Sequence, residues 1–266
     1  MPLTDTLSLD AATLAFLLAM SGKTATADRP GAPPGTRLYA VGDIHGRADL
    51  LRDMHRRIHE DASRARASRT VVVYLGDYID RGSASREVVE LLLDTPLQGF
   101  ERFHLRGNHD HCFTRFLSDI GIAELWLSHG GDDTLRSYGV VPPRSLSDAR
   151  ETRRAQSELR QRLPERHAAF FLGLSQTHCE GNYFFVHAGI RPGIPLEQQA
   201  TTDMLWIEDD FLNSDLDHGK IIVHGHSVTE RPQVRRNRIG IDTGAFATGT
   251  LTCLVLQGTR RLFLQT

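Results

Sequence analysis

Gly76-Asp77-Tyr78-Ile79-Asp80-Arg81-Gly82 is the stretch of sequence that decides how this chain folds. It directly follows Thr70–Leu75, a run of mostly apolar, β-branched residues of strand length. The flanking glycines allow the backbone to turn sharply after such a strand. Ser85–Leu93, which comes next, has apolar residues at helical spacing. This part of the chain therefore predicts a strand, a polar turn and a helix in succession.

The same pattern recurs along the chain. Strand-length runs are Arg37–Val41, Thr70–Leu75, Phe100–Leu105, Tyr183–Val186, Lys220–Val223 and Arg238–Ile241. Polar turns rich in Gly, Asp, Asn or His are Gly42–Gly46, Gly76–Asp77, Gly107–His109, His187–Gly189 and His224–His226. Strands that alternate with helix-like stretches, such as Ala48–Ala67, indicate an α/β fold with a mixed sheet. In such folds ligands bind beyond the carboxyl ends of the strands, which is where these turns fall.

The chain divides into a leading segment and one domain. Residues 1–36 read as an N-terminal segment ending in a Gly- and Pro-rich linker, and residues 37–266 as the domain. Residues 111–182 differ from the rest, and the charged run Ser147–Leu163 within them predicts an all-helical insertion. Leu251–Leu256 and Arg261–Gln265, joined across Gly258, predict a closing hairpin.

Composition excludes several classes of protein. The formal net charge of −2 gives no reason to expect a nucleic-acid partner or an anionic membrane. An apolar run at 11–20 is too short to span a bilayer, and Asp5 and Asp10 stand where a secretion signal carries basic residues, so we expect a short helix there. Three scattered cysteines without a CxxC pair favour a reducing compartment. We therefore expect a cytoplasmic protein of undetermined oligomeric state.

The residue types in the polar turns indicate metal chemistry. Asp, His and Asn supply oxygen and nitrogen ligands without a thiolate, which suits Mn²⁺, Fe or Zn²⁺ better than Ca²⁺ or copper. Two such ions, bridged by a carboxylate, activate water for attack on phosphorus. Any one of these turns is ordinary by itself. Five in succession, each directly after a strand, are not expected by chance.

The turns resemble the signature blocks of the PPP-type serine/threonine protein phosphatases, within the calcineurin-like metallophosphoesterases. The resemblance covers roughly residues 37–245, and stretches such as Gly130–Leu135, His187–Gly193 and Gly240–Gly244 resemble the bacterial branch. It implies mixed β-sheets sandwiched between helices. It also implies two divalent metal ions, of which we expect Mn²⁺, with Fe or Zn²⁺ as alternatives. The implied ligands are Asp43, His45 and a bridging Asp77, then Asn108, His187 and His226.

The resemblance also implies the groups that act on the phosphate. A metal-bridging hydroxide would attack phosphorus, and His109, oriented by Asp80, would protonate the leaving oxygen. Arg81 would clamp the phosphate in a bidentate fork, beside Asn108 and His109. His224, the first histidine of its turn, is expected to be structural rather than a ligand.

One position departs from the pattern. Bacterial relatives commonly carry a second phosphate-binding arginine where this chain has Glu208. A carboxylate facing a phosphate dianion is repulsive, so either Glu208 points away or the substrate differs. We expect Arg191, which follows the His187 turn, to replace the missing arginine.

Three functions remain open at this point. The leading one is hydrolysis of phosphoserine and phosphothreonine in proteins. The second is hydrolysis of diadenosine tetraphosphate or another small phosphate ester, because bacterial relatives resemble those enzymes too. The third is a degenerate module that binds phosphate without turnover, for which Glu208 is the only support.

Overall fold

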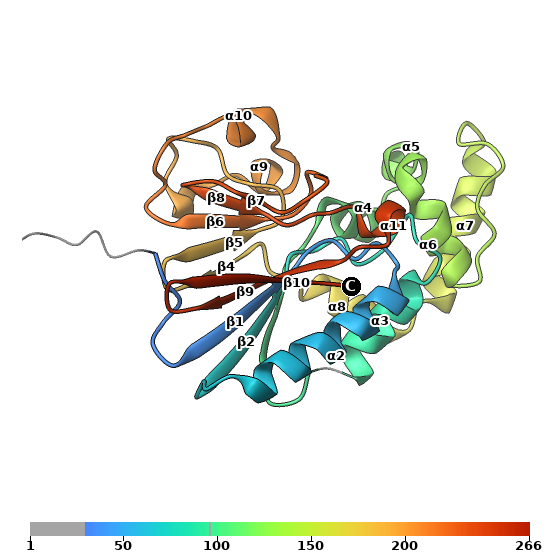
Figure 1. The fold of residues 1–266 in the computed structure, drawn as a ribbon. Coiled ribbons are helices and arrows are strands. Elements are labelled where there is room, and N and C mark those ends of the chain that lie inside the picture. Colours follow the sequence, from blue (N-terminus) through green and yellow to red (C-terminus); the bar gives the residue numbers. More distant parts are fainter. Residues whose placement is uncertain (1–29, 96) are drawn as a thin grey trace, which may run out of the picture.

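The computed structural model describes residues 30–95 and 97–266, and its strands form two five-stranded sheets that pack face to face (Figure 1). The first sheet has the order β10-β9-β1-β2-β3 and the second the order β4-β5-β6-β8-β7. Helices cover the outer faces of both sheets (Figure 1). The expected architecture of mixed sheets between helices is therefore confirmed. The short helix expected near the start of the chain lies outside the described residues.

The first sheet contains the earliest strands of the domain and the closing hairpin. Its strands are β1 (Thr36–Val41), β2 (Arg69–Tyr74), β3 (Glu101–His104), β9 (Thr252–Gln257) and β10 (Arg260–Gln265). β1, β2 and β3 are parallel, so their carboxyl ends meet at one edge of the sheet. β9 is antiparallel to both β1 and β10, which confirms the hairpin.

The second sheet has the same parallel core of three strands. Its strands are β4 (Thr177–Glu180), β5 (Tyr183–Val186), β6 (Ile221–His224), β7 (Gln233–Val234) and β8 (Arg238–Gly240). β5, β6 and β8 are parallel, with β4 and β7 antiparallel at the edges. The polar turns that follow the parallel strands of both sheets therefore meet at one end of the sandwich.

Alternating residues of each strand face different layers. In β1, Leu38 and Ala40 belong to the core between the two sheets, while Tyr39 and Val41 face the outer core under the helices. β5 shows the same period of two, with Phe185 inward and Phe184 outward. Strands buried on both faces read as continuous apolar runs, which is why they stand out in the sequence.

The helices fall into three groups and one single helix near the end of the chain. α2 (Ala48–Arg64) and α3 (Ser85–Asp94) cover the first sheet, and α9 (Thr201–Trp206) and α10 (Asp209–Leu212) lie over the second (Figure 1). Between β3 and β4 come α4 (Asn108–Phe116), α5 (Ala123–Trp126), α6 (Asp132–Ser137), α7 (Ala149–Arg162) and α8 (Glu165–Leu172). The last is α11 (Ala245–Thr248).

The insertion is shorter than expected. Its helices end at Leu172, and β4 occupies the part of 111–182 nearest the next strand. β4 carries Thr, His, Cys and Glu, so its sequence lacks an apolar strand pattern, and pairing with β5 is what makes it a strand. Among the described residues, no helix is long and apolar enough to cross a membrane.

Candidate metal centre

The polar turns at the carboxyl ends of the strands converge on one site. Among the described residues, the non-glycine residues with positive φ are His45, Asp77, Asp80, Arg81 and His226, with φ between 45° and 72°. All of them are site residues expected from the sequence. Side chains rarely adopt this left-handed conformation, and its cost is tolerated where the surroundings fix the backbone for function. Within the described part of the chain, these left-handed non-glycine residues are thus concentrated at this site.

Asp77 lies at the centre of two groups of potential metal ligands. One group joins it with His45 and His109, the other with His187 and His226, and within each group the ligand atoms lie within 4.8 Å of one another. Oδ2 of Asp77 is 3.5 Å from Nε2 of His45 and 3.5 Å from Nε2 of His187. A carboxylate shared by two such groups is placed as a bridge between two ions requires.

The other two expected ligands lie beside these groups. Oδ1 of Asn108 is 2.9 Å from Nε2 of His187, so both atoms can face one ion. Asp43 belongs to neither group; its carboxylate accepts the backbone N–H of His226, with Oδ2 3.1 Å from that nitrogen. The structure thus brings all six expected ligands to one place, with Asp43 at its margin.

Hydrogen bonds to the Nδ1 atoms orient the rings of His45 and His187. Nδ1 of His45 lies 2.8 Å from the carbonyl oxygen of Ile79, and Nδ1 of His187 lies 2.9 Å from that of Leu75. A proton on Nδ1 leaves Nε2 free as a ligand, and this second contact fixes the tautomer. Both imidazoles therefore present a lone pair to Asp77's side of the site.

The charge of the site fits divalent cations. Burial, together with neighbouring carboxylates, raises the pKa of Asp43 and Asp77 well above the usual range. Burial lowers the pKa of His45 and His187, which keeps these rings neutral as metal ligands require. Buried carboxylates facing neutral imidazoles form a set whose charge divalent ions offset. The donors suit a pair of such ions, without indicating which metal.

Two glycines let the backbone approach the metal-ligand carboxylates. A Cβ on Gly107 would stand 2.0 Å from Oδ1 of Asp77, and a Cβ on Gly225 would stand 2.0 Å from Oδ1 of Asp43. Real Cβ atoms do not come this close to an oxygen, so any side chain here displaces the carboxylate. The glycines of these turns are therefore required by close approach to the ligands.

His109 and Asp80 form a buried pair next to the ligands. Nδ1 of His109 lies 2.7 Å from Oδ2 of Asp80, which also accepts Nε1–H of Trp126 at 2.9 Å. Thr134 donates its hydroxyl to Oδ1 of Asp80 at 2.6 Å. Burial raises the pKa of Asp80 to about 8, and the hydrogen bonds from Thr134 and Trp126 act in the opposite direction. With its carboxylate accepting on both oxygens, Asp80 holds the imidazole with Nε2 toward the site.

Arg81 lies next to His109 at the same site. Its Nη2 lies 3.3 Å from Nε2 of His109, and its guanidinium stacks on the ring of Phe246, 4.6 Å from the centroid. The backbone N–H of Arg81 is fixed by the carbonyl of Gly130. Beside the larger effect of burial, the charge of Arg81 acts to lower the pKa of Asp43 and Asp77 and also that of the site histidines His45, His109 and His226. It can therefore hold a phosphate against the metal ligands.

The rim of the metal site, meaning the exposed residues that border the ligands, carries an acidic side chain next to His226 rather than a basic one. Oε1 of Glu208 is 3.5 Å from Nε2 of His226, and its side chain is 65% exposed. Glu208 therefore points toward the metal ligands and not away from them. Arg191 is not brought to the site: its guanidinium binds Asp203 at 2.6 Å and Asp210 at 2.9 Å. Because these carboxylates occupy its donors, the expectation that Arg191 replaces the missing arginine has no support in the structure.

Comparison with known proteins agrees with this geometry. Residues 36–247 match the family model described as "Calcineurin-like phosphoesterase". The chain belongs to the calcineurin-like phosphoesterase family. It is 23% identical to the bis(5'-nucleosyl)-tetraphosphatase PrpE (asymmetrical) of Bacillus thuringiensis strain Al Hakam, covering 80% of this chain and 88% of that protein. It is 25% identical to serine/threonine-protein phosphatase 2 of Escherichia coli K12, covering 81% and 90%.

A solved structure shows the same fold. A protein serine/threonine phosphatase from Saccharomyces cerevisiae superimposes with a TM-score of 0.52 at 14% identity, over 97% of this chain and 90% of that one. At this identity the likeness concerns the fold alone. The chain is accordingly a calcineurin-like phosphoesterase, an enzyme of the metal-dependent phosphohydrolase class.

Two buried aspartates of this phosphoesterase that support the site are not singled out by the sequence. Asp110 accepts the backbone N–H groups of Gly107, Asp77 and Tyr78, so it holds two of the polar turns together. Asp242 is buried, and its charge raises the pKa of Asp43. Asp242 stands in the stretch Gly240–Gly244 that carries the family resemblance, and Asp110 directly follows the Gly107–His109 turn, but no pattern assigned either of them a role.

His224 behaves as the sequence suggested. It is 1% exposed, its Nδ1 lies near the carbonyl of Gly225, and its Nε2 lies 3.4 Å from Nη1 of Arg238. Both ring nitrogens thus face groups other than the metal ligands. The turn directs His226 to the site and His224 into the packing of the second sheet.

Proposed function

We propose that this phosphoesterase removes phosphate from phosphoserine and phosphothreonine in proteins, with Mn²⁺ as its metal. When bound, the metal pair supplies an activated water and neutralises charge on the phosphate. The chain's own residues do the rest. Arg81 holds the phosphate oxygens in a bidentate fork, and its stacking on Phe246 keeps the fork over the ligands.

The leaving oxygen requires a proton donor. Nε2 of His109 lies 3.9 Å from Oδ2 of Asp77, so it borders the place where the phosphate must sit. Asp80, with Trp126 and Thr134 bound to its carboxylate, fixes the orientation of the ring. Such a positioned imidazole protonates the leaving oxygen of an ester and contributes about 10²–10⁴-fold to the rate.

The observation that carries the choice of substrate is the asymmetry of the rim. One side offers the guanidinium of Arg81, and the other offers the carboxylate of Glu208, 3.5 Å from His226. A chain of four phosphates brings more negative charge to this rim than a phosphomonoester does. Because like charges repel, the rim favours a single phosphate group. The similarity to the Escherichia coli enzyme supports a phosphoprotein as its carrier.

A second candidate is the hydrolysis of diadenosine tetraphosphate. It is favoured by the similarity to PrpE, which extends over 80% of this chain. Both reactions use the same ligand cluster, so they differ only in what the rim accepts. A phosphate-binding module without turnover is a third alternative, for which Glu208 remains the only argument.

The test compares substrates on one preparation of the full chain. Initial rates with Mn²⁺ are measured for phosphoserine, phosphothreonine and phosphotyrosine peptides, p-nitrophenyl phosphate and diadenosine tetraphosphate. We expect a higher kcat/KM for the phosphoserine and phosphothreonine peptides than for the nucleotide, and loss of all activity with EDTA that Mn²⁺ reverses. Turnover of the nucleotide alone would contradict the proposal. No turnover of any substrate would favour the binding module.

A further inference from the structure

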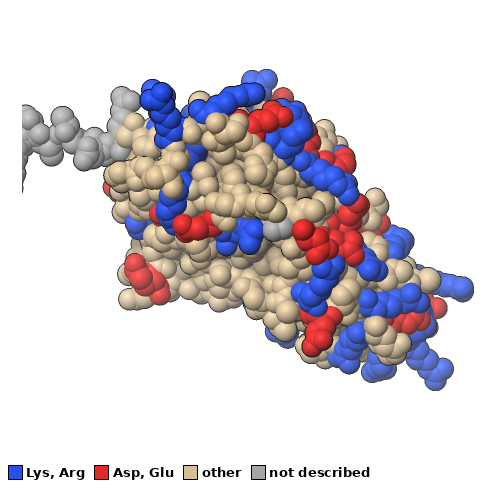
Figure 2. Space-filling view, turned by 90° about the horizontal axis from the view of Figure 1, so that it is seen from below, with Lys and Arg blue, Asp and Glu red and all other residues tan. Residues whose placement is uncertain are grey.

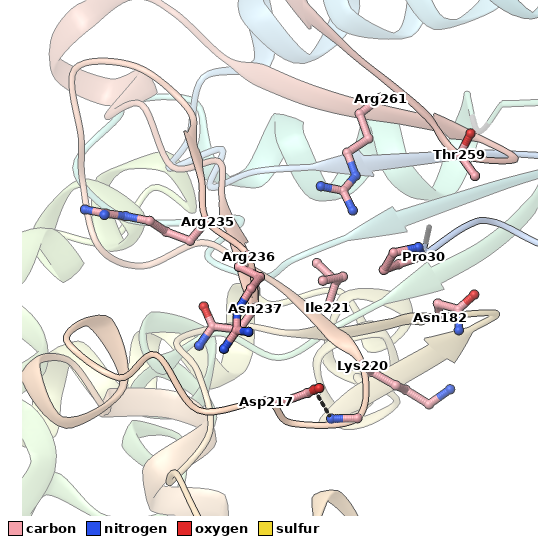
Figure 3. Close-up of a pocket in the computed structure, with 11 residues that line it drawn as sticks. Pro30, Asn182, Asp217, Lys220, Ile221, Arg235, Arg236, Asn237, Thr259 and Arg261 are labelled. Carbon is pink, nitrogen blue, oxygen red and sulfur yellow. Dashed lines mark hydrogen bonds between the residues drawn. The ribbon is translucent and has the colours of Figure 1, made fainter. Parts of the chain in front are cut away.

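A second, positively charged pocket lies away from the metal centre. It has a volume of about 680 Å³ and is formed where the first residues of β5 and β6 meet the β9–β10 turn (Figure 3). Its lining combines basic, amide and apolar residues, among them Lys220, Ile221, Arg235, Arg236, Asn237 and Arg261. The catalytic turns follow the opposite ends of the same strands, so the two sites are separated by the length of the sheet.

The basic residues of this pocket have no acidic partners within the described part of the chain. None of Lys220, Arg235, Arg236 and Arg261 forms an ion pair there. Some arginines elsewhere are paired, as Arg69 is with Glu101 and Glu180, whereas ones without an ion pair in that part of the chain, such as Arg102 and Arg153, do not line this pocket. Acidic and basic side chains are likewise interspersed on the face shown in Figure 2. What distinguishes the pocket is that it brings four basic side chains, without acidic partners among the described residues, together in one concave place.

Among the described residues, Asp217 is the only acidic one in the pocket lining. Its Oδ1 accepts the backbone N–H of Gly219 at 2.8 Å, which holds it in the turn before β6 (Figure 3). Four basic residues therefore share the lining with one carboxylate, which is engaged by the backbone. The unbalanced charge calls for a ligand with more than one negative charge.

Arg261 shows how such a ligand can be held. Its Nε–H is 3.2 Å from the hydroxyl of Tyr183, and its guanidinium lies over the Tyr183 ring, 5.7 Å from the centroid. These contacts leave the two terminal nitrogens without a hydrogen-bond partner among the described residues. Figure 3 shows this guanidinium directed toward Ile221, with Arg235 and Lys220 extending at opposite margins of the pocket. A fixed fork above an apolar floor suits a phosphate group attached to a less polar body.

We propose that this pocket binds a phosphate-bearing small molecule of nucleotide size. Its volume is within the range of ligand-binding pockets, about 300–1,000 Å³. Arg261 grips one phosphate, and Lys220, Arg235 and Arg236 supply the charge for others. Ile221 and Pro30 offer apolar surface to the rest of the molecule. The proposal does not depend on which substrate the metal centre hydrolyses.

The test measures binding to the full chain by isothermal titration calorimetry. The catalytic centre is kept from contributing by working with EDTA and without added metal. The probes are ATP, inorganic tripolyphosphate and orthophosphate, each at low and high salt. We expect ATP and tripolyphosphate to bind more tightly than orthophosphate, with affinity falling as salt rises. Tighter binding of ATP than of tripolyphosphate assigns a nucleotide, and equal binding assigns an inorganic polyphosphate; both support the pocket.

Substitutions of the lining residues test whether the ligand binds at this pocket. Lys220→Gln combined with Arg261→Gln should weaken it by about tenfold or more, because hydrogen bonds to charged groups are the strong ones. Arg56→Gln with Arg154→Gln removes the same charge from ion-paired surface arginines and should leave the affinity unchanged. Thermal melting shows whether each variant is folded. If Arg261→Gln disturbs the packing of Tyr183, which Arg261 contacts, Arg236→Gln alone still tests the site.

Three results would overturn the proposal. The first is an absence of binding by the full chain, which would mean that the pocket is closed or filled in the intact protein. The second is equal weakening by the pocket pair and the control pair, which would reduce the effect to net charge. The third is binding of a single-stranded oligonucleotide without binding of ATP or tripolyphosphate, which would point to a different class of partner.

Discussion

The metal-ligand cluster and the rim above it are built in different ways. The ligands Asp43, Asp77 and His187 are at most 2% exposed, and the backbone fixes them. Glu208, on the rim, is exposed between α9 and α10, and Arg191, exposed as well, is bound to Asp203 and Asp210 of these two helices. Buried, hydrogen-bonded ligands tolerate almost no change, whereas exposed rim side chains can vary without disturbing the fold. The cluster therefore defines the reaction, and the rim defines what reaches it.

Removing the bridging carboxylate tests the cluster most directly. Asp77→Asn should abolish hydrolysis of p-nitrophenyl phosphate, by about 10³-fold or more, because metal stabilisation of transition-state charge is worth several kcal/mol. Metal content by mass spectrometry should fall as well. Asp94→Asn, an exposed change at the end of α3, is the matched control. An Asp77→Asn variant with half of the normal turnover would mean that this carboxylate does not bridge.

His109→Asn separates the proton donor from the ligands. Turnover should fall by about 10²–10⁴-fold, the contribution of a general acid. Metal content should stay unchanged, because His45 and His187 retain their contacts with Asp77. The rate of product formation in a single-turnover experiment, with enzyme in excess, shows whether the chemical step is the one slowed. A fall in metal content would instead make His109 a ligand, as its place in one of the two ligand groups would allow.

The sequence predicts the metal ligands of this site better than the residues that surround them. The ligands lie one to four residues beyond the ends of strands, so a local pattern finds them, and all six converge. Trp126 and Thr134 bind Asp80 from helices of the insertion, 46 and 54 residues away in sequence, so no local pattern could connect them. Arg191 was assigned from its position after a turn, but Asp203 and Asp210 fold onto it from 12 and 19 residues on.

The strands, too, are predictable where a local pattern marks them and unpredictable where they depend on distant partners. Strands buried on both faces, such as β1 and β5, were expected from their apolar runs, within one or two residues of their ends. β4 has intermediate exposure and a polar sequence, and β7 has two residues, so neither carries a periodic signal. Both form because a neighbouring strand offers hydrogen-bonding groups. The division of the strands into two sheets also depends on such long-range pairing.

A change beside a ligand should have a smaller effect than a change of the ligand. Gly225→Ala places a methyl group against Oδ1 of Asp43, so the carboxylate must move. We expect metal affinity to fall by about 10–100-fold, as when the supporting contacts of a ligand are lost. Activity should recover at high Mn²⁺. Gly173→Ala, whose new methyl contacts helix backbone at 3.2 Å away from the site, should behave as wild type. Unchanged metal affinity in Gly225→Ala would show that Asp43 is not a ligand.

The smallest effect is expected at the rim, and it decides the substrate. Glu208→Gln removes a negative charge that faces His226, so KM for anionic phosphates should fall. Because the side chain is mostly exposed and screened by salt, we expect about 2–5-fold at low ionic strength and less at high salt. The gain should be larger for diadenosine tetraphosphate than for a phosphopeptide, since the nucleotide carries more charge. Asp209→Asn removes the same charge one residue on and serves as control. If Glu208→Gln changed both substrates equally, Glu208 would not discriminate between them, and the choice of a phosphomonoester would have to rest on other features of the rim.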